Sequence, residues 1–269
     1  MSCEAPFYIE YENPETGLPE RYKVPCGKCQ SCLRSRRSQW TVRLYHEYLN
    51  AKSAWFVTLT YDDLHLPLEG VNKDDVQKFF KKFRKKQKCR FFLVSEYGDT
   101  FGRPHYHCIF FFPDDVSLVQ CVRLVDQTWQ NGNIQVGEVT LASINYCSKY
   151  ALKDRYDHDE DVLNYPNKTF TLMSRRPGIG ASWLDSEQKK ILKEDQVFEL
   201  QLDGLTYNLP RYYRDKIFSK PEKLKHQIKI QEKYDTADNK ERRDAAWLYR
   251  AEHAADSVLH RNYKPLGGR

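Results

Sequence analysis

The chain has 269 residues, and its 43 Lys and Arg against 37 Asp and Glu give a formal net charge of +6. This length supports one well-packed core, with room for a small N-terminal module and a C-terminal extension. No segment approaches the roughly eighteen uninterrupted apolar residues of a membrane helix, and the N-terminus lacks a signal-peptide pattern. We therefore expect neither a membrane protein nor a secreted one.

Cysteines cluster near the N-terminus, where Cys26, Cys29 and Cys32 are each separated by two residues. Thiolates at this spacing can converge on a tetrahedral ion, and Cys3 becomes the fourth ligand if the N-terminal loop folds back. The second C-x-x-C pair of a zinc ribbon is missing. A structural Zn²⁺, free thiols and an iron–sulfur cluster are therefore the three alternatives.

The remaining chain alternates between helical and strand patterns. The predicted elements are a helix over 31–50, a strand over 55–61, a helix over 72–88, strands over 90–97 and 105–112, a helix over 116–129, a strand over 133–140 and a helix over 142–153. This order predicts an α+β fold, an antiparallel sheet with helices on one face. We expect a Cys-rich segment and basic helix over 1–50, a core domain over 51–215 and a charged helical extension over 216–269.

The predicted helix 72–88 has two different faces. Val76, Phe79, Phe80 and Phe83 fall at helical spacing and predict a buried aromatic stripe, and Asn72 is placed to cap the helix. The other face is basic, which indicates either phosphate contact or an ordinary solvated surface. The basic residues that we expect to bind DNA are Lys81, Lys82, Arg84 and Lys85.

The triplet His105-Tyr106-His107 carries the clearest metal-binding signal, because imidazoles two residues apart on a strand project from one face. Turn residues before it predict a hairpin of strands 90–97 and 105–112. Glu96 joins the histidines if it pairs with His105, whereas a one-residue bulge would turn it away. Such a set can hold one divalent cation and leave positions for a phosphate oxygen. Two packed strand histidines are the alternative.

The predicted helix 142–153 carries two phenols on one face, because Tyr146 and Tyr150 are four residues apart. Lys149 and Lys153 add two ammonium groups nearby. Such a stripe suits a DNA backbone better than a protein core. An amphipathic helix with half-buried tyrosines is the alternative interpretation.

Several motifs in this order resemble the HUH endonucleases that start rolling-circle replication. The sequence is most similar to replication initiators of microviruses, the small single-stranded DNA phages, and especially their gokushovirus branch. The likeness extends from about residue 24 to about residue 213. It is carried by Val24–Cys29, Glu96–Gly98, Arg103–His107, Tyr146–Tyr150, Ser174–Gly180 and Leu209–Tyr213.

The resemblance implies a ferredoxin-like HUH sheet and a metal-dependent nickase and strand transferase. His105 and His107, with Glu96 as third ligand, would hold Mg²⁺ or Mn²⁺, and Tyr146 and Tyr150 would alternate as nucleophiles. Cleavage at the viral origin would leave a 5′-phosphotyrosine and a free 3′-hydroxyl. Expected partners are single-stranded and replicative-form viral DNA, contacted also by Arg103, and the helicase and polymerase of the host. The expected location is the host bacterial cytoplasm.

Three other functions compete with this interpretation. A relaxase- or transposase-type HUH nuclease shares the chemistry and differs in the process served. A metallohydrolase with an activated water explains the metal ligands but leaves the tyrosines without a role. A non-catalytic, zinc-dependent DNA-binding protein explains the cysteines and the basic charge but neither the His pair nor the Tyr pair.

Overall fold

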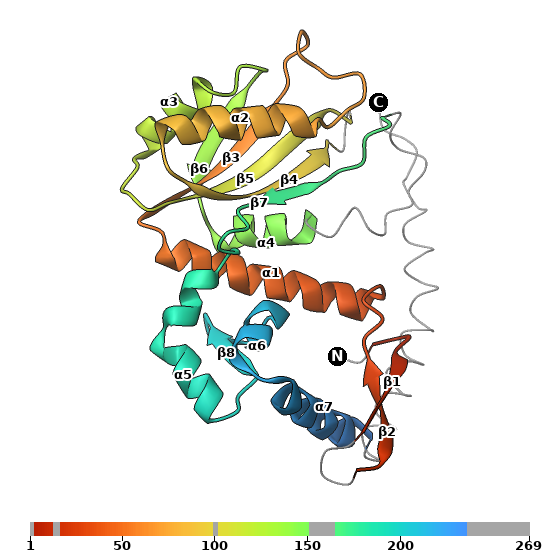
Figure 1. The fold of residues 1–269 in the computed structure, drawn as a ribbon. Helices are drawn as coiled ribbons and strands as arrows, with labels where there is room; N and C mark the ends of the chain where they lie inside the picture. The colour runs from red at the N-terminus through yellow and green to blue at the C-terminus, as the bar shows by residue number, and fades with distance from the viewer. Residues whose placement is uncertain (1–2, 13–16, 99–101, 151–164, 236–269) are drawn as a thin grey trace, which may run out of the picture. The chain divides into compact units, whose positions relative to one another are not determined.

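The computed structural model describes residues 3–12, 17–98, 102–150 and 165–235. The chain folds as two compact units. The first consists of Met1–Ala5 and Cys26–Ile217, and the second of Pro6–Pro25 and Phe218–Arg269. Helix α1 (Gln30–Asn50) lies in the same unit as the central sheet (Figure 1). The division at residues 50 and 215 stays a prediction.

A five-stranded antiparallel sheet forms the centre of the first unit. Its strand order is β6 (Ile134–Glu138), β3 (Ser53–Thr60), β5 (Pro104–Phe112), β4 (Arg90–Tyr97) and β7 (Thr171–Met173). The four longer strands confirm the predicted ones to within a few residues. The three-residue strand β7 has no counterpart in the prediction because so short a segment shows no clear alternation.

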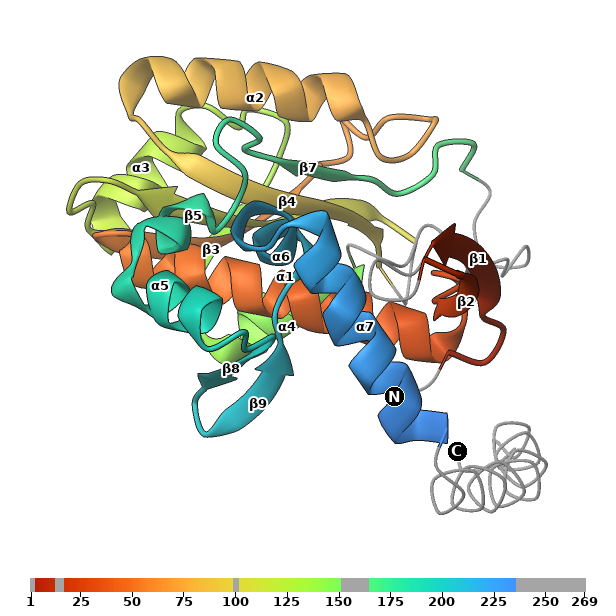
Figure 2. The same cartoon turned by 60° about the horizontal axis from the view of Figure 1, so that its bottom comes forward.

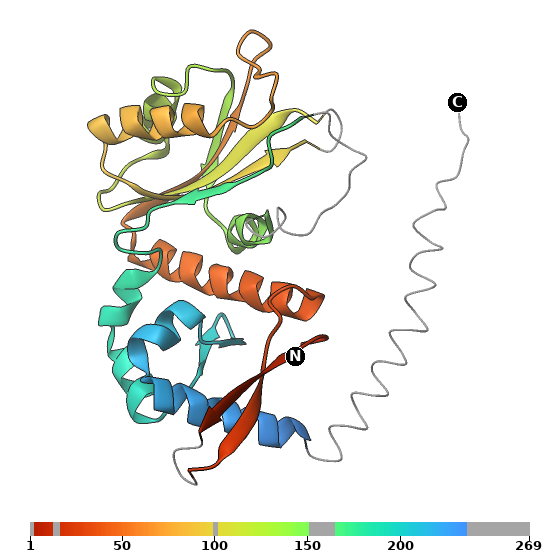
Figure 3. The ribbon, with the colours of Figure 1, turned by 45° about the vertical axis from the view of Figure 1, so that its right-hand side comes forward.

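Helices cover both faces of this sheet, as the edge-on view in Figure 3 shows. On one face lie α2 (Lys73–Lys86) and α3 (Leu118–Asp126), and on the other α4 (Leu141–Tyr150) and α1. The prediction of helices on one face only is therefore wrong. The physical reason lies in β5, where Cys108 and Phe110 are buried on one face and Ile109 and Phe111 on the other.

Helix α2 follows its predicted pattern closely. The Asn72 side chain caps it by accepting hydrogen bonds from the backbone N–H groups of Asp74 and Asp75, at 2.9 and 3.2 Å. Phe80 stacks on Phe91 of β4, with the ring centroids 3.6 Å apart. The aromatic stripe is buried and the basic side chains of the helix are exposed.

The chain after β7 packs against α1 through a buried network. It contains the short helix η2 (Ala181–Asp185), α5 (Glu187–Glu194), the hairpin of β8 (Glu199–Leu202) and β9 (Leu205–Asn208), and α6 (Arg211–Ile217), which are labelled in Figures 1 and 2. The carboxylate of Glu47 on α1 pairs with Arg90 and accepts from the Gly180 amide. Tyr213 donates to the Gly180 carbonyl at 3.0 Å. Two segments that carried the family resemblance, 174–180 and 209–213, therefore meet at α1.

The second unit contains the antiparallel hairpin of β1 (Phe7–Glu12) and β2 (Pro19–Val24) together with α7 (Lys220–Asp235). Gln227 of α7 donates to the Lys23 carbonyl at 2.8 Å. Helix α7 confirms the start of the predicted charged helical extension, and residues 236–269 lie outside the described part. No helix among the described residues is both long and apolar enough to cross a bilayer.

Candidate active site

The β4–β5 hairpin brings three metal-ligating side chains to one face of the sheet. Glu96 pairs with His105 and Val94 with His107 in an unbroken antiparallel register. Residues that pair across strands project from the same face, and alternation places His107 beside His105. The register condition for Glu96 is therefore met, with no bulge between it and the histidines.

The three side chains converge at short range. Glu96 Oε2 lies 3.6 Å from His105 Nε2 and 3.4 Å from His107 Nε2. One ligand atom from each residue lies within 4.8 Å of the other two, and Glu96 is only 3% exposed. Two imidazoles and a carboxylate form a donor set that suits a first-row divalent cation and leaves coordination positions open. The residues fit a metal, whose identity the geometry does not fix.

Neighbouring groups orient both imidazoles. His105 Nδ1 lies 3.1 Å from the Arg103 carbonyl, which can only accept, so Nδ1 carries the proton and the Nε2 lone pair faces Glu96. Thr58 Oγ1 lies 3.0 Å from His107 Nδ1, and the Phe56 ring stacks on His107 at 5.6 Å. Thr58 and Phe56 escaped the sequence reasoning. Their signal is the register of β3, where Thr58 pairs directly with His107.

Helix α4 places Tyr146 against the same carboxylate. The Tyr146 hydroxyl donates to Glu96 Oε2 at 2.5 Å and lies 3.4 Å from His107 Nε2. The rings of Tyr146 and Tyr150 are 4.5 Å apart, as expected for neighbours on one helix face. Buried Ile144 and Cys147 hold the opposite side of α4 on the sheet. The predicted phenol pair and the predicted metal ligands thus meet at one point.

The electrostatics of the site favour an ionised carboxylate and a protonated phenol. Burial alone would raise the pKa of Glu96, but hydrogen bonds from His105, His107 and Tyr146 outweigh it and hold that pKa well below its usual range. Burial, followed by the hydrogen bond to Glu96, raises the pKa of Tyr146 far above its ordinary value. The phenol therefore needs added positive charge nearby before it can act as a nucleophile.

Comparison with known proteins agrees with this arrangement. Residues 54–155 match the family described as Replication-associated protein ORF2. Replication-associated protein VP4 of Bdellovibrio phage phiMH2K is 29% identical over 216 residues, 72% of this chain and 67% of that protein. Replication-associated protein ORF2 of Spiroplasma virus 4 is 31% identical over 215 residues, 71% of this chain and 66% of that protein. The chain belongs to the family of phage replication-associated proteins.

A third relative in this family is Replication-associated protein ORF4 of Chlamydia phage 1, with 26% identity over 222 residues, 72% of this chain and 53% of that protein. The chain thus spans about two thirds of the length of two relatives and about half of the third. The crystal structure of the hypothetical protein ORF119 from Sulfolobus islandicus rod-shaped virus 1 covers 43% of this chain and 93% of that protein at 19% identity, and its TM-score of 0.30 is too low to carry an argument. The predicted resemblance to phage replication proteins is confirmed.

The other residues that were expected at the site lie at varying positions. Lys149 is exposed, with its Nζ 5.3 Å from the centre of the Tyr150 ring, and Lys153 lies outside the described residues. Arg103 donates to the Tyr61 carbonyl at 3.0 Å and to Asp63 at 2.5 Å. The roles of these three basic residues stay predictions.

The basic face of α2 is separated from the histidines by the sheet. Helix α2 packs on Tyr106 and Phe110, whose side chains point away from the face that carries His105 and His107. A contact between this helix and DNA remains a prediction, and it would be distant from the tyrosines. The exposed side chains in question are Lys81, Lys82, Arg84 and Lys85.

A second basic surface, missed by the sequence reasoning, lies between α1 and α6. It is a pocket of about 270 Å³ lined by arginine and aromatic side chains. The Arg43 guanidinium lies 4.4 Å from the centre of the Trp40 ring and 4.2 Å from that of Tyr212. Arg36 and Arg211 complete its positive lining. The Arg-rich start of α1 and the Leu-Pro-Arg-Tyr-Tyr motif were its signals, but only the fold brings them together.

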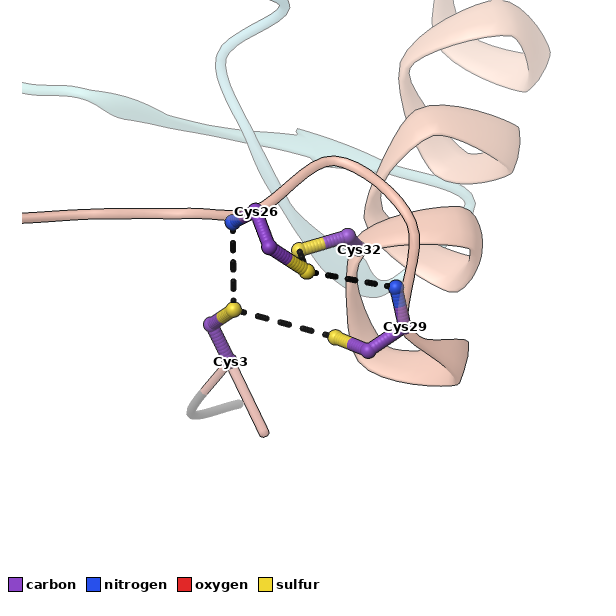
Figure 4. Close-up of side chains that lie close together, drawn as sticks. All are labelled: Cys3, Cys26, Cys29 and Cys32. Carbon is purple, nitrogen blue, oxygen red and sulfur yellow. Dashed lines mark hydrogen bonds between the residues drawn. The ribbon is translucent and has the colours of Figure 1, made fainter. Parts of the chain in front are cut away.

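The four N-terminal cysteines also converge, at a distinct place in the first unit. The Sγ atoms of Cys3, Cys26, Cys29 and Cys32 all lie within 4.8 Å of one another (Figure 4). Backbone N–H groups of Lys28 and Cys29 hydrogen-bond to the Cys26 sulfur and lower its pKa to about 6. The predicted folding back of the N-terminal segment toward the triplet is present.

Proposed function

We propose that this protein is a rolling-circle replication initiator that nicks single-stranded viral DNA at the origin and rejoins it through tyrosine nucleophiles. The observation that carries the proposal is the 2.5 Å contact between the Tyr146 hydroxyl and Glu96, a residue that faces both histidines. Membership of the phage replication-associated family supports the process served.

In this mechanism His105, His107 and Glu96 hold a divalent cation. The cation supplies positive charge that polarises a non-bridging oxygen of the scissile phosphate and favours the phenolate. Because two of the three ligands are imidazoles, we expect Mn²⁺ to serve at lower concentration than Mg²⁺, which prefers oxygen ligands.

Tyr146 performs the first transesterification. Its phenolic oxygen forms a bond to phosphorus while the bond from phosphorus to the 3′ oxygen breaks, so no phosphodiester energy is lost to hydrolysis. The phenol loses its proton and the departing 3′ oxygen gains one. The products are a 5′-phosphotyrosine and a 3′-hydroxyl, which can prime a host polymerase. Tyr150, on the same helix face, is placed to accept the next strand end.

This role requires partners that the chain does not supply. The sequence contains no G-x-x-x-x-G-K-[ST] motif, so strand separation would depend on a host helicase. The protein would act on single-stranded and replicative-form DNA in the host bacterial cytoplasm. A relaxase- or transposase-type nuclease would use the same atoms, and the phage relatives favour replication instead.

The test is a denaturing gel of the protein after incubation with labelled single-stranded oligonucleotides that tile the phage genome encoding it. With Mn²⁺, we expect one oligonucleotide to give a protein band shifted by covalently attached DNA. Tyr146→Phe should lose this band, and Tyr8→Phe, at an exposed position of β1, should keep it. Cleavage without any adduct would instead identify a metallohydrolase, and binding without cleavage a non-catalytic DNA-binding protein.

A further inference from the structure

The four N-terminal cysteines have the geometry of a metal site. The Sγ atoms of Cys3 and Cys29 are 3.8 Å apart, and those of Cys26 and Cys32 are 4.0 Å apart. A tetrahedral Zn²⁺ with Zn–S bonds of about 2.3 Å requires S···S separations of about 3.8 Å. The measured separations are therefore close to the edges of such a tetrahedron, and all four cysteines are free of disulfides.

The backbone around the sulfurs is arranged as in a thiolate site. The Cys26 sulfur accepts from the N–H groups of Lys28 and Cys29, at 3.4 and 3.3 Å. The sulfurs of Cys3 and Cys29 accept from the N–H groups of Cys26 and Glu4, at 3.2 and 3.5 Å. Such donors stabilise negative charge on sulfur and fix the direction in which each sulfur points.

The other cysteines of the chain show what structural thiols look like here. Cys108, Cys121 and Cys147 are fully buried, and each sits singly in the apolar core. The four N-terminal cysteines are only half-buried and belong to no apolar cluster of the described residues. Four thiols brought together outside a core gain nothing from packing, which leaves metal binding as the reason for their convergence.

We propose that Cys3, Cys26, Cys29 and Cys32 bind one structural Zn²⁺. The metal would join the N-terminal segment to the start of α1, where Cys29 is the N-cap residue without a side-chain cap hydrogen bond and Cys32 lies in the first turn (Figure 4). Closed coordination by four thiolates leaves no position for substrate, so this metal is not catalytic.

The zinc would also hold both roots of the β1–β2 hairpin. The segment Pro6–Pro25, which contains the hairpin, leaves the first unit after Ala5 and re-enters it at Cys26. Cys3 and Cys26 thus bracket that segment, and one ion fixes its two ends. Because α1 is hydrogen-bonded to α4 through Thr41 and Asn145 at 3.1 Å, the metal also secures the helix that supports the tyrosine helix.

The test measures metal content in the full chain purified without chelator. Elemental analysis should give one zinc per chain, and a mercurial thiol reagent should release it. Cobalt substitution should give the intense visible and near-ultraviolet bands of tetrahedral thiolate coordination. Cys26→Ser and Cys29→Ser should lose the metal, while Cys89→Ser, a half-buried cysteine outside the cluster, and His105→Ala should retain it.

The outcomes separate this proposal from the nickase proposal. A wild-type chain without zinc whose four cysteines react freely, or one that carries an iron–sulfur chromophore, would overturn the zinc site whatever the nicking activity. Zinc that persists in Cys26→Ser but disappears in His105→Ala would place it at the wrong site. As a second readout, zinc removal should speed proteolytic cleavage within residues 6–25 at least tenfold, and an unchanged rate would refute the anchoring role.

Discussion

Glu96 and His105 are direct partners across the β4–β5 hairpin, with 3.6 Å between the carboxylate oxygen of one and Nε2 of the other. If Glu96 is a metal ligand, Glu96→Gln should raise the Mn²⁺ concentration needed for half-maximal nicking by at least about tenfold, because an amide is a weaker ligand than a carboxylate. A metal titration of the nicking rate measures this. Glu138→Gln, at an exposed carboxylate of the same sheet, is the control. An unchanged requirement in Glu96→Gln would remove Glu96 from the site.

The two tyrosines should differ in role. The Tyr146 hydroxyl lies 2.5 Å from Glu96 and 3.4 Å from His107, at the centre of the ligand set, so we expect Tyr146 to cleave first. Tyr146→Phe should lower adduct formation at least about a hundredfold, as expected for loss of a nucleophile. Tyr150→Phe should form the first adduct within a few-fold of the wild-type rate and fail to rejoin strands. Single-turnover assays with separate cleavage and joining substrates measure both steps. The reverse pattern would exchange the two assignments.

The basic face of α2 should affect DNA affinity and leave the chemistry unchanged. Because this helix lies on the face opposite His105, the triple variant Lys81→Ala/Lys82→Ala/Lys85→Ala should nick at the wild-type rate when DNA is saturating. Its affinity should fall, and the slope of log K against log salt should decrease by about 0.7 for each lost phosphate contact. Fluorescence anisotropy over a salt series measures the slope. An unaltered slope would mean that this face is merely solvated.

Gly180 should tolerate no side chain. It has a φ of +75°, and an added Cβ would lie 2.3 Å from the Tyr213 hydroxyl and 2.8 Å from the Arg43 carbonyl oxygen. Gly204 has nearly the same φ, +72°, with no atom within 4 Å of an added Cβ. Gly204→Ala should therefore cost about 1 kcal/mol of unfolding free energy for its backbone conformation alone.

Gly180→Ala should cost about 2 kcal/mol more than Gly204→Ala, because a backbone carbonyl cannot move aside as a flexible side chain can. Urea denaturation measures both variants, and the comparison is valid where the two m-values agree. Equal losses would show that α6 and α1 can shift apart without cost.

Buried His46 should make stability depend on pH. Its Nδ1 lies 3.1 Å from the Tyr213 hydroxyl, its ring stacks on Trp183, and Glu47 is its chain neighbour. Burial lowers the pKa of His46 to about 4. The unfolded chain, with an ordinary pKa of about 6.5, binds a proton that the folded chain refuses. This contribution is therefore complete above about pH 6.5 and is lost as the pH falls toward 4, at up to about 1.4 kcal/mol per pH unit.

The difference between wild type and His46→Gln isolates this effect, because all other titrating groups are common to both. Chemical denaturation at a series of pH values between 7 and 4 measures it. His65→Gln, at an exposed histidine, should leave the pH dependence of the wild type intact. If the His46→Gln curve runs parallel to the wild-type curve, His46 is not the group responsible.

The sequence was sufficient wherever local pattern decides the structure. Alternation along 105–112 assigned each side chain of β5 to its correct face, and the spacing of Tyr146 and Tyr150 placed both phenols together. The pairing of Glu96 with His105 depended on a hairpin without a bulge, which the sequence permitted but could not decide.

What the sequence could not show depends on contacts between distant segments. The second helical layer arises because α1 packs on the face that carries Ile109, and no local signal connects α1 to that face. The same holds for the buried carboxylate of Glu47, which meets Arg90 and the Gly180 amide from three separate stretches of chain. Residues that looked like parts of separate motifs are in fact the joints of one core.

Tyr146 and Tyr150 stand on successive turns of a single short helix, with their rings 4.5 Å apart. The helical pitch is about 5.4 Å, so a DNA end handed from one phenol to the other would travel little further than the width of a base. Under the proposed chemistry, closing the circle would then require no hinge between the two compact units, and variants that stiffen the chain around residues 5 and 26 should circularise DNA as well as the wild type.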